Sequence, residues 1–127
     1  MPLVGPLKIK AQLRCGSDFA MGPGKADLLE AIDREGSISA AGRALGMSYR
    51  RAWLLVDEMN RTWKRPLVET VAGGGKDRGA HVTETGRQVL AAYRDLEARL
   101  VESAGGEALA RLQRLLLDEP RPSQKGA

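Results

Sequence analysis

The stretch 36–60 constrains the fold more than any other part of the chain. Gly46 stands where a helix must end and the backbone must turn sharply, a position that favours a residue able to adopt a positive φ. Gly42 lies about one helical turn earlier, where a side chain would hold the next helix away. Ser48 offers a hydroxyl that can cap the first turn of a second helix. The stretch therefore predicts two helices that cross closely at a tight turn.

Apolar residues in the same stretch recur mostly at three- and four-residue steps, which predicts one shared inner face. This face consists of Ile38, Ala41, Leu45, Met47, Ala52, Leu55, Val56 and Met59. Tyr49, Arg50 and Arg51 remain outside, at the start of the second helix. Helix-turn-helix proteins place this end in the major groove of DNA, where arginine can bind guanine through two hydrogen bonds. The pattern predicts a DNA reader; ordinary solvated charges on an amphipathic helix are the alternative.

The composition is compatible with one domain and an anionic partner. The chain has 127 residues and a formal net charge of +4, with a pI near 9.6. A positive balance favours DNA as partner when the charge is localised. Because Cys15 is the single cysteine, an internal disulfide and a metal site with paired cysteines are excluded. No window approaches the ~20 apolar residues of a membrane span, which predicts a cytoplasmic protein without membrane contact.

The residues before the helix-turn-helix predict a hairpin and a helix. Residues 7–15 alternate strictly between apolar and polar side chains, which is typical of a half-buried strand. Gly16 can adopt a positive φ in the turn that follows, so residues 18–22 predict the returning strand. Residues 25–35 carry leucine and isoleucine at helical spacing and end at Gly36, which predicts a first helix packed behind the motif.

The residues after the second helix predict a wing, meaning two strands joined by a loop. Residues 67–71 and 81–83 read as the strands, and the glycine-rich loop between them contains Lys76 and Arg78. Such a loop can contact phosphate or the minor groove beside a recognition helix, so both residues are predicted to bind DNA. A charged hairpin tip that serves solubility is the alternative. A phosphate-binding P-loop is excluded, because Asp77 follows the lysine where that motif needs serine or threonine.

The C-terminal part predicts two helices suited to dimerisation. Thr83 is expected to cap a long helix from Glu84 to about Glu102, with apolar residues at four- and three-residue steps. These residues are Val89, Tyr93, Leu96 and Leu100. A shorter helix over 107–117 carries five leucines that a small domain cannot easily bury, which favours a dimer surface. Folding of this helix back onto its own domain is the alternative, and residues 118–127 are predicted to be disordered.

Several short strings in these elements resemble a known family. They are Gly36-Ser-Ile-Ser, Gly46-Met-Ser-Tyr-Arg, Ala52-Trp53, Glu58-Met-Asn60, Leu67-Val68, Val82-Thr83 and Gly86, together with the glycine-rich loop. Over about residues 7–117 they resemble the N-terminal DNA-binding domain of the ModE family, molybdate-responsive transcriptional regulators of bacteria. More distantly, the runs at 37–45 and 82–86 look like the winged helix of LysR-type regulators.

The resemblance implies a homodimer that binds a pseudo-palindromic operator in double-stranded DNA, near genes for molybdenum transport or molybdoenzymes. Carried over by position, residues 48–51, which are Ser48, Tyr49, Arg50 and Arg51, begin the recognition helix, while Lys76 and Arg78 lie in the wing. Trp53 and Asn60 match the family string, but their spacing points them partly inward, so we expect packing or capping roles. Dimer contacts would come from the N-terminal strands, the first helix and the long helix after the wing.

The chain departs from full-length ModE proteins, which continue into molybdate-binding domains built of small β-barrels. No strand-rich second half follows before Ala127, so we expect no molybdate pocket and no bound cofactor or metal. Oxyanion binding needs converging amides, hydroxyls and cations, which the residues after Leu117 do not offer. Two explanations are open: a single-domain regulator that senses through a separate molybdate-binding protein, or a truncated form of a longer one.

Taken together, the sequence predicts a mainly α fold with small β elements. The expected architecture is a winged helix-turn-helix domain over 1–117, with an N-terminal hairpin, C-terminal dimerisation helices over 83–117 and a tail over 118–127. We expect a sequence-specific, DNA-binding transcriptional regulator of the ModE type. An enzyme is disfavoured, because His81 and Cys15, the only histidine and cysteine, fall in elements that the wing arrangement separates. The alternative function is a winged-helix protein–protein interaction module without specific DNA readout.

Overall fold

The computed structural model describes residues 2–71 and 79–123. Its elements are β1 (Leu3–Val4), β2 (Leu7–Lys8), β3 (Leu13–Cys15), β4 (Asp18–Met21), α1 (Pro23–Glu35), α2 (Ile38–Ala44), α3 (Tyr49–Thr62), β5 (Val68–Thr70), β6 (Ala80–Val82), α4 (Glu84–Ala104) and α5 (Glu107–Leu115). Within these ranges the strands form three antiparallel pairs, β1 with β2, β3 with β4 and β5 with β6. The predicted fold, a winged helix-turn-helix with small β elements, is confirmed.

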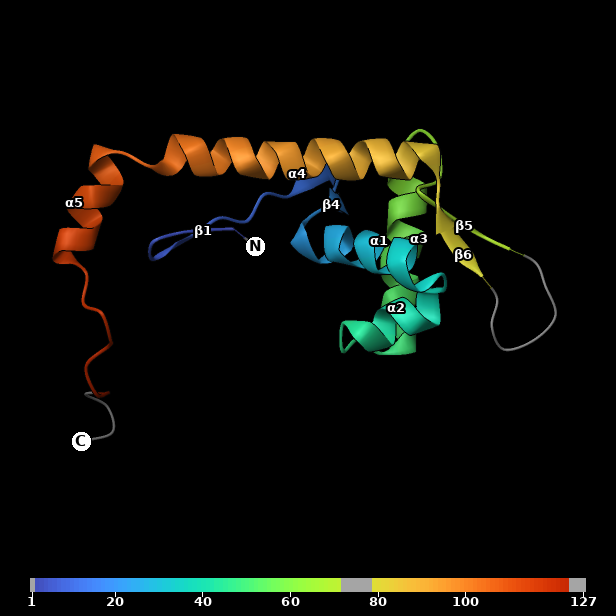
Figure 1. Cartoon of the computed structure of the whole chain (residues 1–127), viewed down its shortest axis with the longest axis horizontal. Helices are drawn as coiled ribbons and strands as arrows, with labels where there is room; N and C mark the ends of the chain where they lie inside the picture. The colour runs from blue at the N-terminus through green and yellow to red at the C-terminus, as the bar shows by residue number, and fades with distance from the viewer. Residues whose placement is uncertain (1, 72–78, 124–127) are drawn as a thin grey trace.

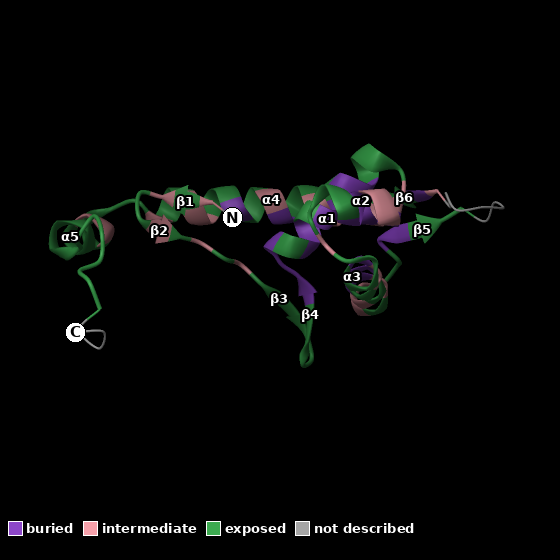
Figure 2. Cartoon of the chain, turned by 90° about the horizontal axis from the view of Figure 1, so that it is seen from below, coloured by how far each residue is buried: buried purple, intermediate pink, exposed green. Residues whose placement is uncertain are grey.

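The molecule consists of a compact body and a long arm (Figure 1). Helices α1, α2 and α3 and the β5–β6 pair make the body at one end of α4. Helix α4 runs away from this body, carries α5 at its far end and passes over the β1–β2 pair. Buried residues concentrate in the body, whereas α5 and the outer half of α4 are mostly exposed (Figure 2). The hydrophobic core therefore belongs to the body.

The first helix and the helix-turn-helix follow the predicted boundaries closely. Helix α1 starts two residues earlier than predicted, because Pro23 fits the first turn, where its missing N–H costs no hydrogen bond. It ends at Gly36, whose φ of 78° lets its N–H bond to the Ile32 carbonyl oxygen at 2.9 Å. The Gly36 carbonyl in turn accepts from the Ala80 N–H at 2.8 Å. This bond ties the wing to the end of α1.

The predicted continuous strand over 7–15 is wrong. Its ends become β2 and β3, which pair with different partners, and the residues between them cross α4 without strand pairing. The buried Tyr93 hydroxyl donates to the Ala11 carbonyl oxygen at 2.7 Å, so this carbonyl is committed to a side chain. All three residues of β3 are exposed, which also contradicts the predicted half-burial. The predicted β3–β4 hairpin is confirmed, with Gly16 at a φ of 60°.

The wing strands are confirmed but shorter than predicted, because Thr83 caps α4. The Thr83 hydroxyl accepts from the Gly86 N–H at 3.0 Å and donates to the Pro66 carbonyl at 2.7 Å. Gly86 packs so closely on the base of β5 that a Cβ there would lie 2.4 Å from the Leu67 oxygen. Strand β6 therefore ends at Val82, and α4 begins directly against the wing.

Helix α4 is also attached to α1 through an ion cluster. The Arg94 guanidinium bonds Asp27 and Glu30 of α1 and Glu97 of its own helix. Glu97 is buried beside Tyr93 on the same helix. The position of the arm relative to the body is thus fixed by specific polar contacts in addition to apolar packing.

The two C-terminal helices differ slightly from their predicted lengths. Helix α4 continues to Ala104, two residues past the predicted end, and α5 stops at Leu115 rather than Leu117. Residues 118–123 are exposed and contain no helix or strand. No helix in the described part of the chain is both long enough and apolar enough to span a bilayer.

Candidate nucleic-acid interface

The turn between α2 and α3 has the geometry that its glycines predict. Gly46 has a φ of 70°, and the Met47 N–H bonds back to the Gly42 carbonyl oxygen at 2.8 Å. A Cβ on Gly42 would lie 3.1 Å from the Cβ of Ala52, so a side chain would push α3 outward. Both glycines therefore set how closely the two helices cross.

The first turn of α3 is capped as predicted. The Ser48 hydroxyl accepts from the Arg51 N–H at 3.1 Å, which satisfies an amide that has no partner within the helix. All four predicted residues, Ser48 to Arg51, are exposed at this end, and Tyr49 is 62% exposed. Helix α3 thus presents its N-terminal turn to solvent.

The inner face of the motif is largely confirmed. Ala41, Ala52, Val56 and Met59 are among its buried members, and Met47 packs partly against the same core. Leu45 is the exception: it caps the C-terminal end of α2 and is 36% exposed. Its position at the start of the turn carries it off the buried face, which the spacing of apolar residues alone did not indicate.

The sequence prediction missed most of the exposed outer stripe of α3. Arg50, Leu54, Asp57 and Arg61 follow one another at four-, three- and four-residue steps, and all four are exposed. Arg61 Nε bonds Asp57 Oδ2 at 2.9 Å, and this hydrogen bond raises the pKa of the Arg61 guanidinium. The same spacing from Arg50 could have revealed the stripe from the sequence, because such residues share one helix face.

The flank of α3 toward the wing is held by Asn60. Its side-chain oxygen accepts from the Leu67 and Val68 N–H groups at 2.9 and 3.1 Å, and its amide donates to the Val68 carbonyl at 3.0 Å. Trp53 packs partly against the core, with its ring centroid 6.1 Å from that of Tyr49. The expected packing and capping roles of Asn60 and Trp53 agree with these contacts.

The wing itself is described only at its base. Strands β5 and β6 pair from Val68 with Val82 to Thr70 with Ala80. His81 on β6 lies 3.3 Å from Glu69 on β5, both exposed. Lys76 and Arg78 fall outside the described residues, so their DNA-binding roles stay predictions.

The comparisons with known proteins agree with this geometry. Residues 25–87, which span α1 to the start of α4, match the family described as bacterial regulatory helix-turn-helix protein, lysR family. The chain belongs to this family. Its members are DNA-binding regulators of transcription in bacteria, which agrees with the exposed first turn of α3.

Three curated relatives carry names related to molybdenum. The chain is 43% identical to the molybdenum transport protein ModE of Azotobacter vinelandii, over 70% of this chain and 37% of that protein. It is 38% identical to the molybdenum-pterin-binding protein MopA of Rhodobacter capsulatus, over 82% and 38% of the two chains. It is 35% identical to the DNA-binding transcriptional dual regulator ModE of Escherichia coli (strain K12), over 77% and 36%. The resemblance to ModE-type regulators is confirmed, and the chain spans less than two-fifths of these relatives' length.

Proposed function

We propose that this chain is the DNA-binding part of a ModE-type transcriptional regulator, without catalytic activity, that acts as a homodimer in the cytoplasm. The observation that carries the proposal is the exposed first turn of α3, held in place by the Ser48 cap and the close crossing at Gly42. Tyr49, Arg50 and Arg51 would contact bases and phosphates in the major groove. Lys76 and Arg78 would add wing contacts to the backbone or minor groove.

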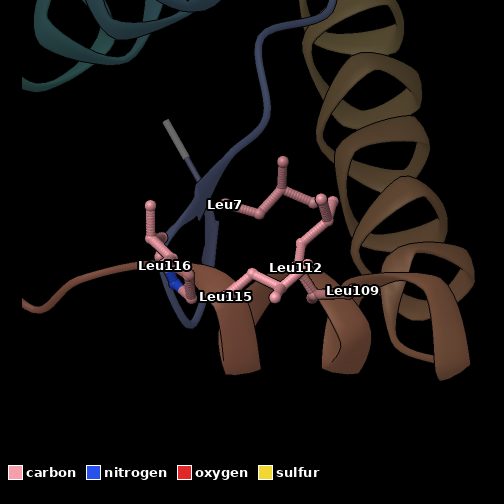
Figure 3. A pocket seen from close by; sticks show the side chains of 6 residues that line it. Leu7, Leu109, Leu112, Leu115 and Leu116 are labelled. Atoms are coloured by element: carbon pink, nitrogen blue, oxygen red, sulfur yellow. The ribbon is translucent and has the colours of Figure 1, made fainter.

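The proposed dimer is supported by apolar surface on the arm. Leu115 is 83% exposed and Leu112 is 64% exposed. With Leu109 and Leu116 of the same C-terminal region, and Pro6 and Leu7 of the N-terminal hairpin, they line an apolar groove of about 350 Å³ (Figure 3). Monomeric proteins rarely leave so continuous an apolar surface uncovered. A twofold dimer would place two α3 helices in major grooves about 34 Å, or a multiple of it, apart.

The regulated genes are proposed from the names of the relatives. Those names point to molybdenum transport, and we extend this to genes for molybdoenzymes. In this proposal the molybdate signal reaches the DNA-binding part from a molybdate-binding unit outside the 127 residues, such as a separate protein.

The test is selection of bound genomic fragments, followed by affinity measurement on the selected operator. Arg50→Ala with Arg51→Ala should weaken operator binding by at least tenfold, because loss of one bidentate base contact costs ~1–3 kcal/mol. The matched control is Arg99→Ala with Arg121→Ala, which removes the same charge from exposed positions on the arm and tail. Equal affinities of the two double variants would contradict the assignment of the recognition helix.

Two further arms separate the alternatives. A protein–protein interaction module would bind random duplex DNA weakly and without the salt dependence that counterion release produces. Binding selections run with and without molybdate test direct oxyanion sensing by the chain. Equal fragment sets in both conditions are expected, since the proposal places the molybdate-binding unit elsewhere.

A further inference from the structure

A second cleft lies on the flank of α3 that faces away from the wing. Figure 2 shows α3 between the β3–β4 hairpin and the β5–β6 pair, and contacts between α3 and β4 agree with this view. The cleft has a volume of about 310 Å³. Its polar lining comes from Lys10 and Gln12 before the hairpin, Lys25 at the start of α1, and Arg51 and Glu58 of α3.

The lining carries three cations and one carboxylate. Lys25 is only 7% exposed, and its ammonium donates to the Phe19 carbonyl oxygen at 2.7 Å. Its one carboxylate contact, with Glu58 Oε2, is long at 3.5 Å. Among the described residues, neither Lys10 nor Arg51 forms an ion pair. The cleft is therefore a concave site with an excess of positive charge.

The start of α1 adds to this positive charge. Its N-cap is Gly22, no side chain caps its first turn, and that turn contains no acidic residue. The uncapped amides carry the positive end of the helix dipole. Gly24 opens into the cleft, and no atom lies within 4 Å of the place where its Cβ would be. The helix end reinforces the cationic side chains, which are the main feature of the site.

The hairpin that forms the outer wall is fixed to α3. Trp63, just after α3, donates its indole N–H to the Ala20 carbonyl oxygen of β4 at 3.0 Å. Arg51 stands on the cleft side of the same turn that presents Arg50 on the outer stripe. The cleft and the exposed end of α3 therefore form one rigid surface.

We propose that this cleft binds a backbone phosphate of the DNA, on the groove wall opposite to the one that the wing contacts. The inference rests on the proposed function. A helix inserted in the major groove, about 12 Å wide, lies between two phosphate walls. The wing can reach one wall, and the cleft lies toward the other. Lys10 and Arg51 would bind the phosphate oxygens directly, while buried Lys25 would supply charge beneath them.

The test uses two substitutions that separate folding from phosphate binding. Gly24→Asp places a carboxylate in the cleft without a clash, and a negative charge in a first helical turn favours the helix. Its melting temperature should be unchanged or higher, while operator affinity falls at least tenfold. Lys10→Gln should lower the salt slope of binding by about 0.9 per protomer, equivalent to about a 3.5-fold loss for a fourfold change in salt.

Each substitution has a matched control. Gly106→Asp adds the same charge at the start of α5, where no atom lies within 4 Å of the Cβ position and which is remote from α3 (Figure 1). Lys8→Gln removes the same charge from an exposed residue two positions from Lys10, outside the cleft lining. Both controls should bind the operator like the unmodified chain. Equal losses in a variant and its control would overturn the site, because only general electrostatics would be at work.

The remaining outcomes distinguish this inference from the proposed function. If the unmodified chain binds the operator and loses affinity through Arg50 and Arg51 but not through Gly24→Asp or Lys10→Gln, the cleft assignment fails alone. If the unmodified chain binds no duplex DNA, the proposed function fails. Titration with molybdate, sulfate and inorganic phosphate, followed by the Gly24 amide resonance, tests a free oxyanion as occupant. Saturation by any of them at micromolar concentration would overturn the assignment to DNA phosphate.

Discussion

Replacing Gly86 by alanine should destabilise the protein at the junction between the wing and the arm. The new Cβ would lie 2.4 Å from the Leu67 oxygen and 2.7 Å from Cγ1 of Val82. An ordinary contact needs at least 3.4 Å, so the Leu67 carbonyl must move by about 1 Å. That carbonyl accepts from the Thr83 N–H at 2.9 Å, and the movement would weaken this bond as well.

The magnitude follows from three opposing effects. Overpacking in a close contact costs ~1–3 kcal/mol, and a weakened hydrogen bond costs up to ~1 kcal/mol. Replacing glycine by alanine inside a helix returns up to ~1 kcal/mol, and less in the first turn, where Gly86 lies. We expect a net loss of about 2 kcal/mol, which corresponds to a fall in melting temperature of about 8 °C for a chain of this size.

Urea and thermal unfolding monitored by circular dichroism measure this change. Gly24→Ala is the matched control, because no atom lies within 4 Å of its Cβ position and it also stands in a first helical turn. The control should be as stable as the unmodified chain or slightly more stable. If Gly86→Ala unfolds together with the control, the close approach of α4 to the base of β5 does not exist as described.

Two further predictions concern the arm. Burial raises the pKa of Tyr93 to about 12, from an ordinary value near 10, so its neutral hydroxyl is favoured in the folded state. The associated stability, about 2 kcal/mol, is present below pH 10 and is lost as the pH rises from 10 to 12; alkaline unfolding should show this loss, Tyr93→Phe should lack it, and Tyr49→Phe should retain it. Leu112→Asp with Leu115→Asp should shift the proposed dimer toward monomer in sedimentation experiments without lowering the melting temperature of the body, because both side chains are exposed; an unchanged dimer would place the interface elsewhere.

The parts of the fold that the sequence predicts well depend on local signals. Gly46 ends α2, Ser48 caps α3 and Thr83 caps α4, and each acts within a few residues of its own position. The strand predicted over 7–15 failed because alternation specifies a face but not a partner. The contact that divides it, from Tyr93 to Ala11, joins residues 82 positions apart. No local pattern contains that information.

The candidate interface divides in the same way. The start of α3 was predictable because a helix cap and three exposed side chains are adjacent in the sequence. The cleft beside α3 was not, since Lys10, Lys25 and Arg51 come from three separate segments. The Trp63 bond to Ala20 that holds its outer wall also joins distant residues. Sequence periodicity therefore identifies the reading helix, while its phosphate-binding surroundings emerge only from tertiary packing.

The contacts around α3 also separate what sets base preference from what sets operator spacing. Asn60 holds the wing and Trp63 holds the hairpin, both near the C-terminal end of α3, so its N-terminal turn is free to enter a groove. The direction of the arm is set elsewhere, by Arg94 against Asp27 and Glu30 and by the seat of Gly86. In the proposed dimer, the arm determines the distance between the two reading helices. Substitutions at the Arg94 cluster should therefore change the preferred half-site spacing, whereas those at Arg50 change the preferred bases.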